Sequence, residues 1–230
     1  MHFVAELAKL RLKIGEKHIF KDITMSIPAQ GITVLLGPSG TGKSTLLRIL
    51  TGQILDHSSV SWDGKISVAG QAMQGSYIEA HAALVGQKAS LLLGTVWESL
   101  VCEWSERSEL TQQEQRSKLA SILHNWGQQD LMVLYSSTVL SLTNSQKIRI
   151  SIIRKALSTA SLLMLYEPTA NLSPAEDSEV LNLIKLISKH TPMLVVTHKI
   201  NHAQHLADQV VLIASGVVQE QATAENFFFQ

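Results

Sequence analysis

The sequence has almost no cysteine, no excess of charge of either sign and no long apolar run, and each shortage excludes something. Cys102 is the only cysteine among 230 residues, so the chain cannot form a disulfide within itself. A single thiol fits a reducing compartment, because structural disulfides persist mainly in oxidising ones. Lysine plus arginine number 19, as do aspartate plus glutamate, so the formal charge is zero. The sequence therefore lacks the general basic charge that would indicate a nucleic-acid partner.

The apolar segments are too short to cross a membrane. None approaches the ~18–20 residues that a spanning helix needs. The N-terminus reads MHFVAELAKLRLKIG and lacks the basic region followed by an apolar core that is typical of a signal peptide. We therefore expect a chain that is soluble by itself and that would need another subunit for any membrane role.

A glycine-rich loop is the most informative feature that the sequence does contain. Residues 37–45 read GPSGTGKST and match the pattern G-x-x-x-x-G-K-[ST]. The apolar run Ile32–Leu36 before it predicts a buried parallel strand, and Ser44–Leu50 predicts a helix. This order aims backbone N–H groups and a helix N-terminus at a phosphate. Lys43 would reach the β- and γ-phosphates, and the Ser44 hydroxyl would ligate Mg²⁺. We expect the nucleotide to be held by Gly37, Pro38, Ser39, Gly40, Thr41, Gly42, Lys43, Ser44 and Thr45.

Alternation of apolar and polar residues predicts antiparallel strands near the N-terminus. Ala8–Ile14 and Ile23–Ile27 both alternate, as half-buried strands do. Another strand is predicted over Lys65–Ala69, after a turn at Asp63-Gly64. Residues 90–158 read as mostly helical.

The last third of the chain alternates buried strands with helices. Strands are predicted over Leu162–Leu165, Met193–Val196 and Val210–Ile213, and an amphipathic helix over Ser178–His190. This alternation favours an α/β fold with a mainly parallel sheet. We expect a nucleotide-binding core made of residues 1–87 and 159–230, with a helical lobe over 88–158.

Further motifs follow the glycine-rich loop in a characteristic order. They are an apolar strand that ends in an acid, a strand that ends in histidine, a glutamine loop and a C-terminal strand pair: residues 162–169 (LLMLYEPT), 194–198 (LVVTH), 85–87 (VGQ) ahead of 94–100 (GTVWESL), and 207–220 (ADQVVLIASGVVQE). In this order and spacing the set resembles the ATP-binding subunit of ABC transporters, over essentially the whole chain. Importer-type subunits look most similar, and the segments GPSGTGKSTLLR and VGQKASLL resemble those of phosphate importers.

The resemblance implies a fold and a set of residue roles. The fold would be that of a P-loop NTPase of the ABC ATPase type, with a mainly parallel sheet core, an antiparallel β subdomain and a helical subdomain. Glu167 would be the general base that polarises the attacking water. His198 would contact the γ-phosphate and hold that water in line. Gln87 would touch Mg²⁺ or the water and sense a transmembrane partner.

The resemblance also implies ligands, partners and a location. ATP and Mg²⁺ would be the ligands, and no nucleic acid would be involved. Two such subunits, identical or different, would dimerise head-to-tail around two ATP molecules and drive a transmembrane permease. The chain would lie in the cytoplasm, on the inner face of the membrane, attached through that permease.

Several positions depart from the family pattern. Tyr166 stands where the family has an aspartate that holds the Mg²⁺ shell. The signature Leu-Ser-Gly-Gly-Gln falls on residues 142–146, which read LTNSQ, so Asn144 and Ser145 replace both glycines. Ile14 occupies the place of the aromatic that stacks on adenine, and Ser173 that of a loop aspartate. A tyrosine brings no negative charge at neutral pH, and side chains obstruct a close backbone approach to phosphate. We therefore expect weak hydrolysis by a homodimer.

Plainer interpretations of the same residues stay open. Glu167 could cap a turn before Pro168, Gln87 could be an ordinary loop residue, and Tyr166 could be a packing residue. His198 could be structural, or could form a metal site with His202 and His205 at spacings of four and three residues. Two other functions also stay open: a regulatory switch that binds ATP with little or no hydrolysis, and an ABC protein that never meets a permease.

Overall fold

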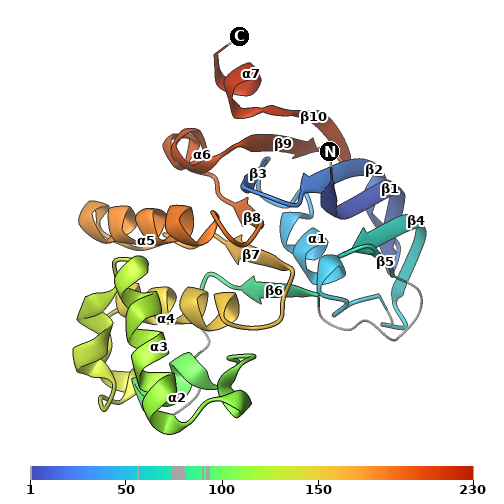
Figure 1. The fold of residues 1–230 in the computed structure, drawn as a ribbon. Coiled ribbons are helices and arrows are strands. Elements are labelled where there is room, and N and C mark those ends of the chain that lie inside the picture. The colour runs from blue at the N-terminus through green and yellow to red at the C-terminus, as the bar shows by residue number, and fades with distance from the viewer. Residues whose placement is uncertain (1, 56, 74–80, 90, 92–93, 230) are drawn as a thin grey trace. The chain divides into compact units, whose positions relative to one another are not determined.

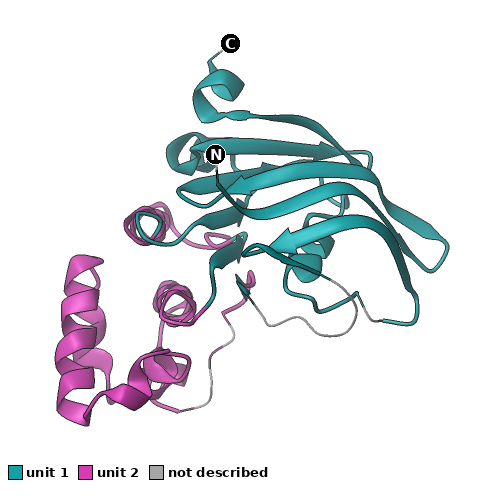
Figure 2. Ribbon diagram, turned by 45° about the vertical axis from the view of Figure 1, so that its right-hand side comes forward, with its two compact units in different colours: residues 1–84, 160–167, 188–230 teal, residues 85–159, 168–187 magenta. Residues whose placement is uncertain are grey.

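The computed structural model describes residues 2–55, 57–73, 81–89, 91 and 94–229. The chain forms two compact units, residues 1–84, 160–167 and 188–230 in one, and residues 85–159 and 168–187 in the other (Figure 2). Residues 168–187 thus group with the helical unit, although the sequence analysis placed them with the core. Our division of one ATP-binding domain into core and helical subdomain stays a proposal. The VGQKASLL segment extends over residues 90 and 92, which lie outside the described residues.

One sheet runs through the strands of the described residues (Figure 1). Its strands are β1 (Phe3–Ile14), β2 (Lys17–Pro28), β3 (Ile32–Leu36), β4 (Val60–Val68), β5 (Gln71–Ala72), β6 (Ala82–Val85), β7 (Leu162–Tyr166), β8 (Met193–Val196), β9 (Gln209–Ala214) and β10 (Val217–Thr223). Their order is β5-β4-β1-β2-β10-β9-β3-β8-β7-β6. The sheet therefore joins an antiparallel part to a parallel part.

The parallel part confirms the expected α/β core. β3 pairs in parallel with both β8 and β9, and β7 pairs in parallel with β8. Every residue of β3 and β8 is buried. Strands that are covered on both faces need continuous apolar runs, which is why these segments were predictable from sequence.

The antiparallel part is built on β1, which pairs with β2 on one side and β4 on the other. Leu10 and Leu12 are fully buried while Arg11 between them is exposed, as the alternating pattern predicted. The predicted turn at Asp63-Gly64 is wrong, because both residues lie inside β4. Gly64 has φ of +112°, and a Cβ there would come within 2.6 Å of the Lys9 carbonyl oxygen. The Asp-Gly pair therefore serves a local irregularity in the strand rather than a chain reversal.

The first unit contains three helices within its described residues: α1 (Lys43–Leu50), α6 (Ile200–Leu206) and α7 (Ala224–Phe228). Leu46, Leu47 and Leu50 of α1 are buried in the same apolar cluster as Phe20 and Val196. Burial of this face fixes α1 against the sheet directly after the glycine-rich loop.

The second unit is helical, as the sequence predicted for residues 90–158. Its helices are α2 (Val96–Val101), α3 (Gln112–Asn125), α4 (Asn144–Ala156) and α5 (Pro174–Ile187), with 3₁₀ turns at Arg107–Glu109, Gln129–Leu134 and Val139–Ser141. Each of α2, α3 and α4 begins with a capping box, at Thr95, Thr111 and Thr143. In each box the threonine side chain accepts a hydrogen bond from the backbone N–H three residues later, and the side chain of that later residue accepts one from the threonine N–H. No helix in the described part of the chain is long and apolar enough to cross a bilayer.

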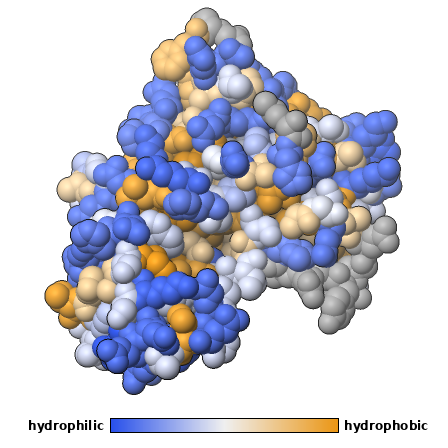
Figure 3. Space-filling view, viewed as in Figure 1, coloured by the Kyte–Doolittle hydropathy of each residue, from blue (hydrophilic) through white to orange (hydrophobic). Residues whose placement is uncertain are grey.

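The helix predicted over Ser178–His190 begins earlier, at Pro174. Ser173 and Glu176 exchange hydrogen bonds at its start, and proline suits the first helical position. Its predicted apolar face is correct: Val180, Ile184 and Ile187 are fully buried. On the face drawn in Figure 3, hydrophilic side chains are mixed with smaller apolar areas, as on an ordinary protein surface.

Candidate active site

The glycine-rich loop leads from β3 into α1. Gly42 is the N-cap residue of α1, in the left-handed conformation at φ of 91°, and no side chain accepts a hydrogen bond from the first turn. A helix start leaves several N–H groups without a partner inside the helix. The start of α1 therefore offers free donors and a positive dipole end to an anion.

Two of the loop glycines are required by close contacts. A Cβ on Gly37 would collide with the carbonyl oxygen of Ile213 on β9. A Cβ on Gly42 would lie 2.7 Å from Cε1 of Phe20 and 2.8 Å from Cγ2 of Ile19. Both glycines also have positive φ, so a larger residue would be strained as well as crowded.

The side chain of Lys43 turns back into the curve of the glycine-rich loop. Its side chain is buried, and Nζ donates to the carbonyl oxygens of Gly37 at 2.7 Å and Pro38 at 2.8 Å. Burial lowers the pKa of Lys43 below its ordinary value, and the charge of Glu167 opposes that shift. The ammonium is thus partly desolvated and held where the loop curves around it, as a phosphate ligand requires.

Glu167 and His198 meet at the ends of two neighbouring parallel strands. Glu167 follows β7, and its N–H donates to the Val196 carbonyl oxygen at 2.9 Å. Its Oε2 lies 2.9 Å from Nδ1 of His198, which follows β8. The Glu167 side chain is 13% exposed and that of His198 is 69% exposed, so the acid is sheltered while the histidine faces solvent. Glu167 has φ of +49°, a conformation that a non-glycine residue adopts only where its surroundings fix it.

Tyr166, the last residue of β7, is half-buried. It packs against the apolar cluster that includes Val196 and Leu46. Its contacts therefore support the packing interpretation of this residue. The position adds a phenol, and no carboxylate, to the end of the strand.

Gln87 belongs to the second unit, where it lines a hollow of about 340 Å³ together with Asn144. The remaining lining residues are Lys88, Ala89, Lys147, Ile148, Ala170 and Asn171. The structure thus brings Gln87 beside the altered signature, and it brings Glu167 and His198 together in the first unit.

The start of α4 carries the altered signature. Thr143 Oγ1 accepts from the N–H of Gln146 at 3.2 Å, and Gln146 Oε1 accepts from the N–H of Thr143 at 3.0 Å. Ser145 is 2% exposed, and its Oγ donates to Oε2 of Glu179 on α5 at 3.4 Å. Its side chain therefore points inward, and only Asn144 of the two replaced glycines is exposed.

Arg149 anchors α4 to its neighbours. It is 6% exposed and makes two hydrogen bonds to the Asp130 carboxylate, at 2.8 and 3.0 Å, and one to Oε1 of Gln128 at 2.8 Å. Its Nε lies 3.8 Å from Oε2 of Glu179. The sequence analysis missed the roles of Asp130 and Glu179, because no local pattern connects these separate segments.

The three histidines do not form the metal site considered from the sequence. His198 precedes α6, whereas His202 lies on α6 and is 6% exposed. In the described ranges, no three histidine, cysteine, aspartate or glutamate side chains cluster closely enough to hold a metal ion.

A glycine-rich loop between a parallel strand and a helix, with a buried lysine and a strand-end acid, defines a P-loop nucleotide-binding protein. The sequence pattern of the ABC transporter family matches residues 20–170. The L-cystine import ATP-binding protein TcyC of Bacillus subtilis (strain 168) is 32% identical over 225 residues, which cover 95% of this chain and 90% of that protein. The chain therefore belongs to the ABC transporter family, among its ATP-binding subunits, as the motifs predicted.

One further relative agrees with this assignment, and a solved structure agrees with the fold. The phosphate import ATP-binding protein PstB of Colwellia psychrerythraea (strain 34H / ATCC BAA-681) is 27% identical over 97% of this chain and 82% of its own. The structure of cbiO1 from Clostridium perfringens, described as part of the ABC transporter complex cbiONQ, superposes with a TM-score of 0.83. It covers 99% of this chain and 91% of its own, at 24% identity. That similarity confirms the ABC ATPase fold.

Proposed function

We propose that this ATP-binding subunit dimerises, drives a separate transmembrane permease from the cytoplasmic face of the membrane, and hydrolyses ATP weakly. The matched relatives are named as import ATP-binding proteins, which supports a permease partner. The contrast between an intact phosphate loop and a β7 that ends in Tyr166, where the family has an aspartate, carries the proposal of weak hydrolysis.

The residues of the loop fit a nucleoside triphosphate. The start of α1 has no side-chain cap, and Lys43 directs its ammonium into the loop. The site fits Mg²⁺ less completely. Ser44 offers a hydroxyl as a ligand, but Tyr166, at the end of β7, packs against apolar residues and offers no carboxylate. A bound Mg²⁺ would neutralise charge that develops on the phosphates.

The chain's own residues would then act as follows. Gly37–Thr45 bind the phosphates through backbone N–H groups and Lys43. Glu167 accepts a proton from the attacking water, and His198 holds the water and orients the carboxylate at 2.9 Å. Gln87, from the second unit, reports occupancy to the permease.

The primary test is to measure Mg²⁺-ATP binding and turnover by the purified chain, with and without a co-expressed permease. We expect firm ATP binding, slow turnover and loss of that turnover in Glu167→Gln. Tight binding with turnover unchanged by Glu167→Gln would instead favour a regulatory switch. Failure to co-purify with any multi-span membrane protein would favour an ABC protein without a permease.

A second variant tests the role of Tyr166. Tyr166→Asp should raise turnover by about tenfold, because an added carboxylate would support the Mg²⁺ shell. Tyr166→Phe is the matched control and should leave the rate unchanged. A rate for Tyr166→Asp no higher than that of the parent would count against the proposed limitation.

A further inference from the structure

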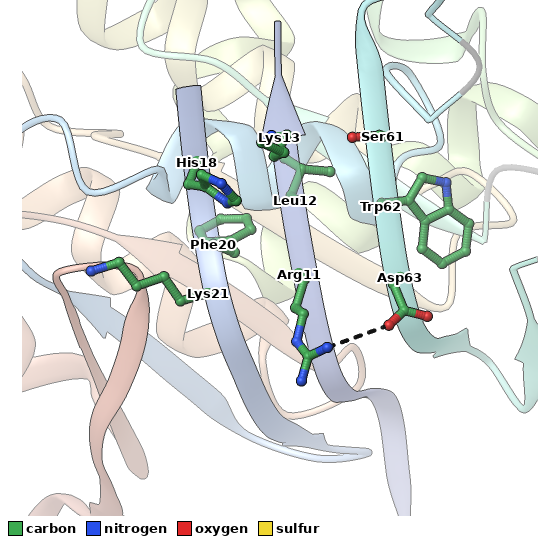
Figure 4. A pocket seen from close by; sticks show the side chains of 9 residues that line it. All are labelled: Arg11, Leu12, Lys13, His18, Phe20, Lys21, Ser61, Trp62 and Asp63. Atoms are coloured by element: carbon green, nitrogen blue, oxygen red, sulfur yellow. Dashed lines mark ion pairs between the residues drawn. The ribbon is translucent and has the colours of Figure 1, made fainter. Parts of the chain in front are cut away.

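The outer face of the antiparallel part of the sheet contains a hollow of about 480 Å³ (Figure 4). Three strands supply its polar lining: Arg11 and Lys13 from β1, His18 and Lys21 from β2, and Ser61 and Asp63 from β4. Phe20 and Leu12 also line it and are buried. The residues of the phosphate loop are not part of this lining, so the hollow is separate from the nucleotide site.

Basic side chains line both β1 and β2 at this hollow. Lys13 is paired with His18 in the strand register, and the next printed pair is Leu12 with Phe20. Arg11 on β1 and Lys21 on β2 also line the hollow, and the register shifts between Leu10 and Leu12. The cations that line the hollow are therefore Arg11, Lys13 and Lys21.

The negative charge in the hollow is small by comparison. Asp63 lies 3.8 Å from Arg11, with side chains 79% and 61% exposed. An exposed pair at that distance contributes little. Lys13, His18 and Lys21 form no ion pair with any residue in the described ranges. The charges of Lys13 and Lys21 are therefore left to solvent or to a ligand.

We propose that this hollow binds a small soluble polyphosphate anion. Several cations surround one concave space, and a chain of phosphate groups can meet each of them with its own oxygens. The Ser61 hydroxyl adds a donor to phosphate oxygen. The hollow has the volume of an ordinary small-molecule site. Binding should weaken as salt screens the charges.

Tripolyphosphate is the probe, titrated by calorimetry into the 230-residue chain carrying Lys43→Ala, which disables the phosphate loop. We expect binding to persist in this background. Adding Lys13→Ala or Lys21→Ala should each weaken binding by about tenfold, the effect of one charge-assisted hydrogen bond. Lys65→Ala is the matched control, since Lys65 is an exposed lysine of β4 outside the hollow, and should change affinity less than about twofold.

Three results would overturn the proposal. Loss of tripolyphosphate binding on Lys43→Ala alone would place the anion in the phosphate loop. An equal loss in the Lys65→Ala control would reduce the effect to general attraction. Binding to vesicles of anionic lipid, with none to tripolyphosphate, would identify a membrane surface instead. Lys13→Ala with an intact Lys43 should bind ATP as the parent does, so this site and the nucleotide site can fail independently.

Discussion

The starts of α1 and α4 differ in how their backbone N–H groups are satisfied. α1 follows Gly42 and has no side-chain cap, whereas α4 begins with the reciprocal Thr143–Gln146 box. Inward contacts also hold the first turns of α4, through Ser145 and Arg149. One helix start is left open to a ligand, and the other is completed by the protein itself. The comparison supports the proposal that this chain binds nucleotide tightly and hydrolyses it slowly.

The largest expected effect is at the open helix start. Lys43→Ala should weaken ATP binding by about 100-fold or more, because a buried cation that contacts phosphate is removed. Fluorescent-nucleotide titration measures this. Arg48→Ala, at an exposed position of the same helix, is the control and should bind as the parent does. Similar losses in both variants would show that the loop geometry is not what selects the ligand.

The next effect is at the anchor of α4. Arg149→Ala should lower the free energy of unfolding by about 2–3 kcal/mol, because the hydrogen bonds to Asp130 and Gln128 are lost. Urea unfolding followed by tryptophan fluorescence measures it. Arg149→Lys keeps the charge without the bidentate geometry, so its free energy of unfolding should lie between those of the parent and Arg149→Ala. An Arg149→Ala protein as stable as the parent would contradict the anchoring role.

A smaller effect is expected at the cap of α4. Thr143→Ala should destabilise the protein by about 1 kcal/mol, the ordinary value of a lost N-cap. The same urea titration detects the shift. Thr223→Ala, at the N-cap of the short helix α7, should have less effect, because α7 buries no residue.

The smallest effect concerns the two replaced glycines. Ser145→Gly should leave ATP turnover within about twofold of the parent, because its side chain already points toward Glu179. Asn144→Gly should raise turnover more, since Asn144 is exposed at the first turn. Steady-state phosphate release compares the two. The reverse order would mean that the inward bond of Ser145 is the limiting feature.

Much of the fold was predictable because its signals are local. Continuous apolar runs gave β3, β7, β8 and β9, and the glycine loop gave the start of α1. The turn predicted at Asp63-Gly64 was wrong, because a strand irregularity requires the same backbone conformation as a turn. The early start of α5 had a signal in Ser173, Pro174 and Glu176 that periodicity alone did not use.

The candidate site was predictable in its members but not in its contacts. The strand-end positions of Glu167 and His198 follow from parallel neighbours, so their meeting could be expected. The inward direction of Ser145 could not, because it depends on Glu179, which lies 34 residues away in sequence. The network of Arg149 likewise joins three separate segments, and only the folded chain brings them together.

The missing cap at Gly42 has a consequence for how long the protein survives in a cell. A ligand that completes the first turn of α1 binds the folded chain and not the unfolded one, so it stabilises the fold by mass action. At 100 times its dissociation constant that gain is about 2.7 kcal/mol. Resistance to proteolysis should therefore rise and fall with nucleotide supply, and an energy-starved cell should degrade this subunit faster.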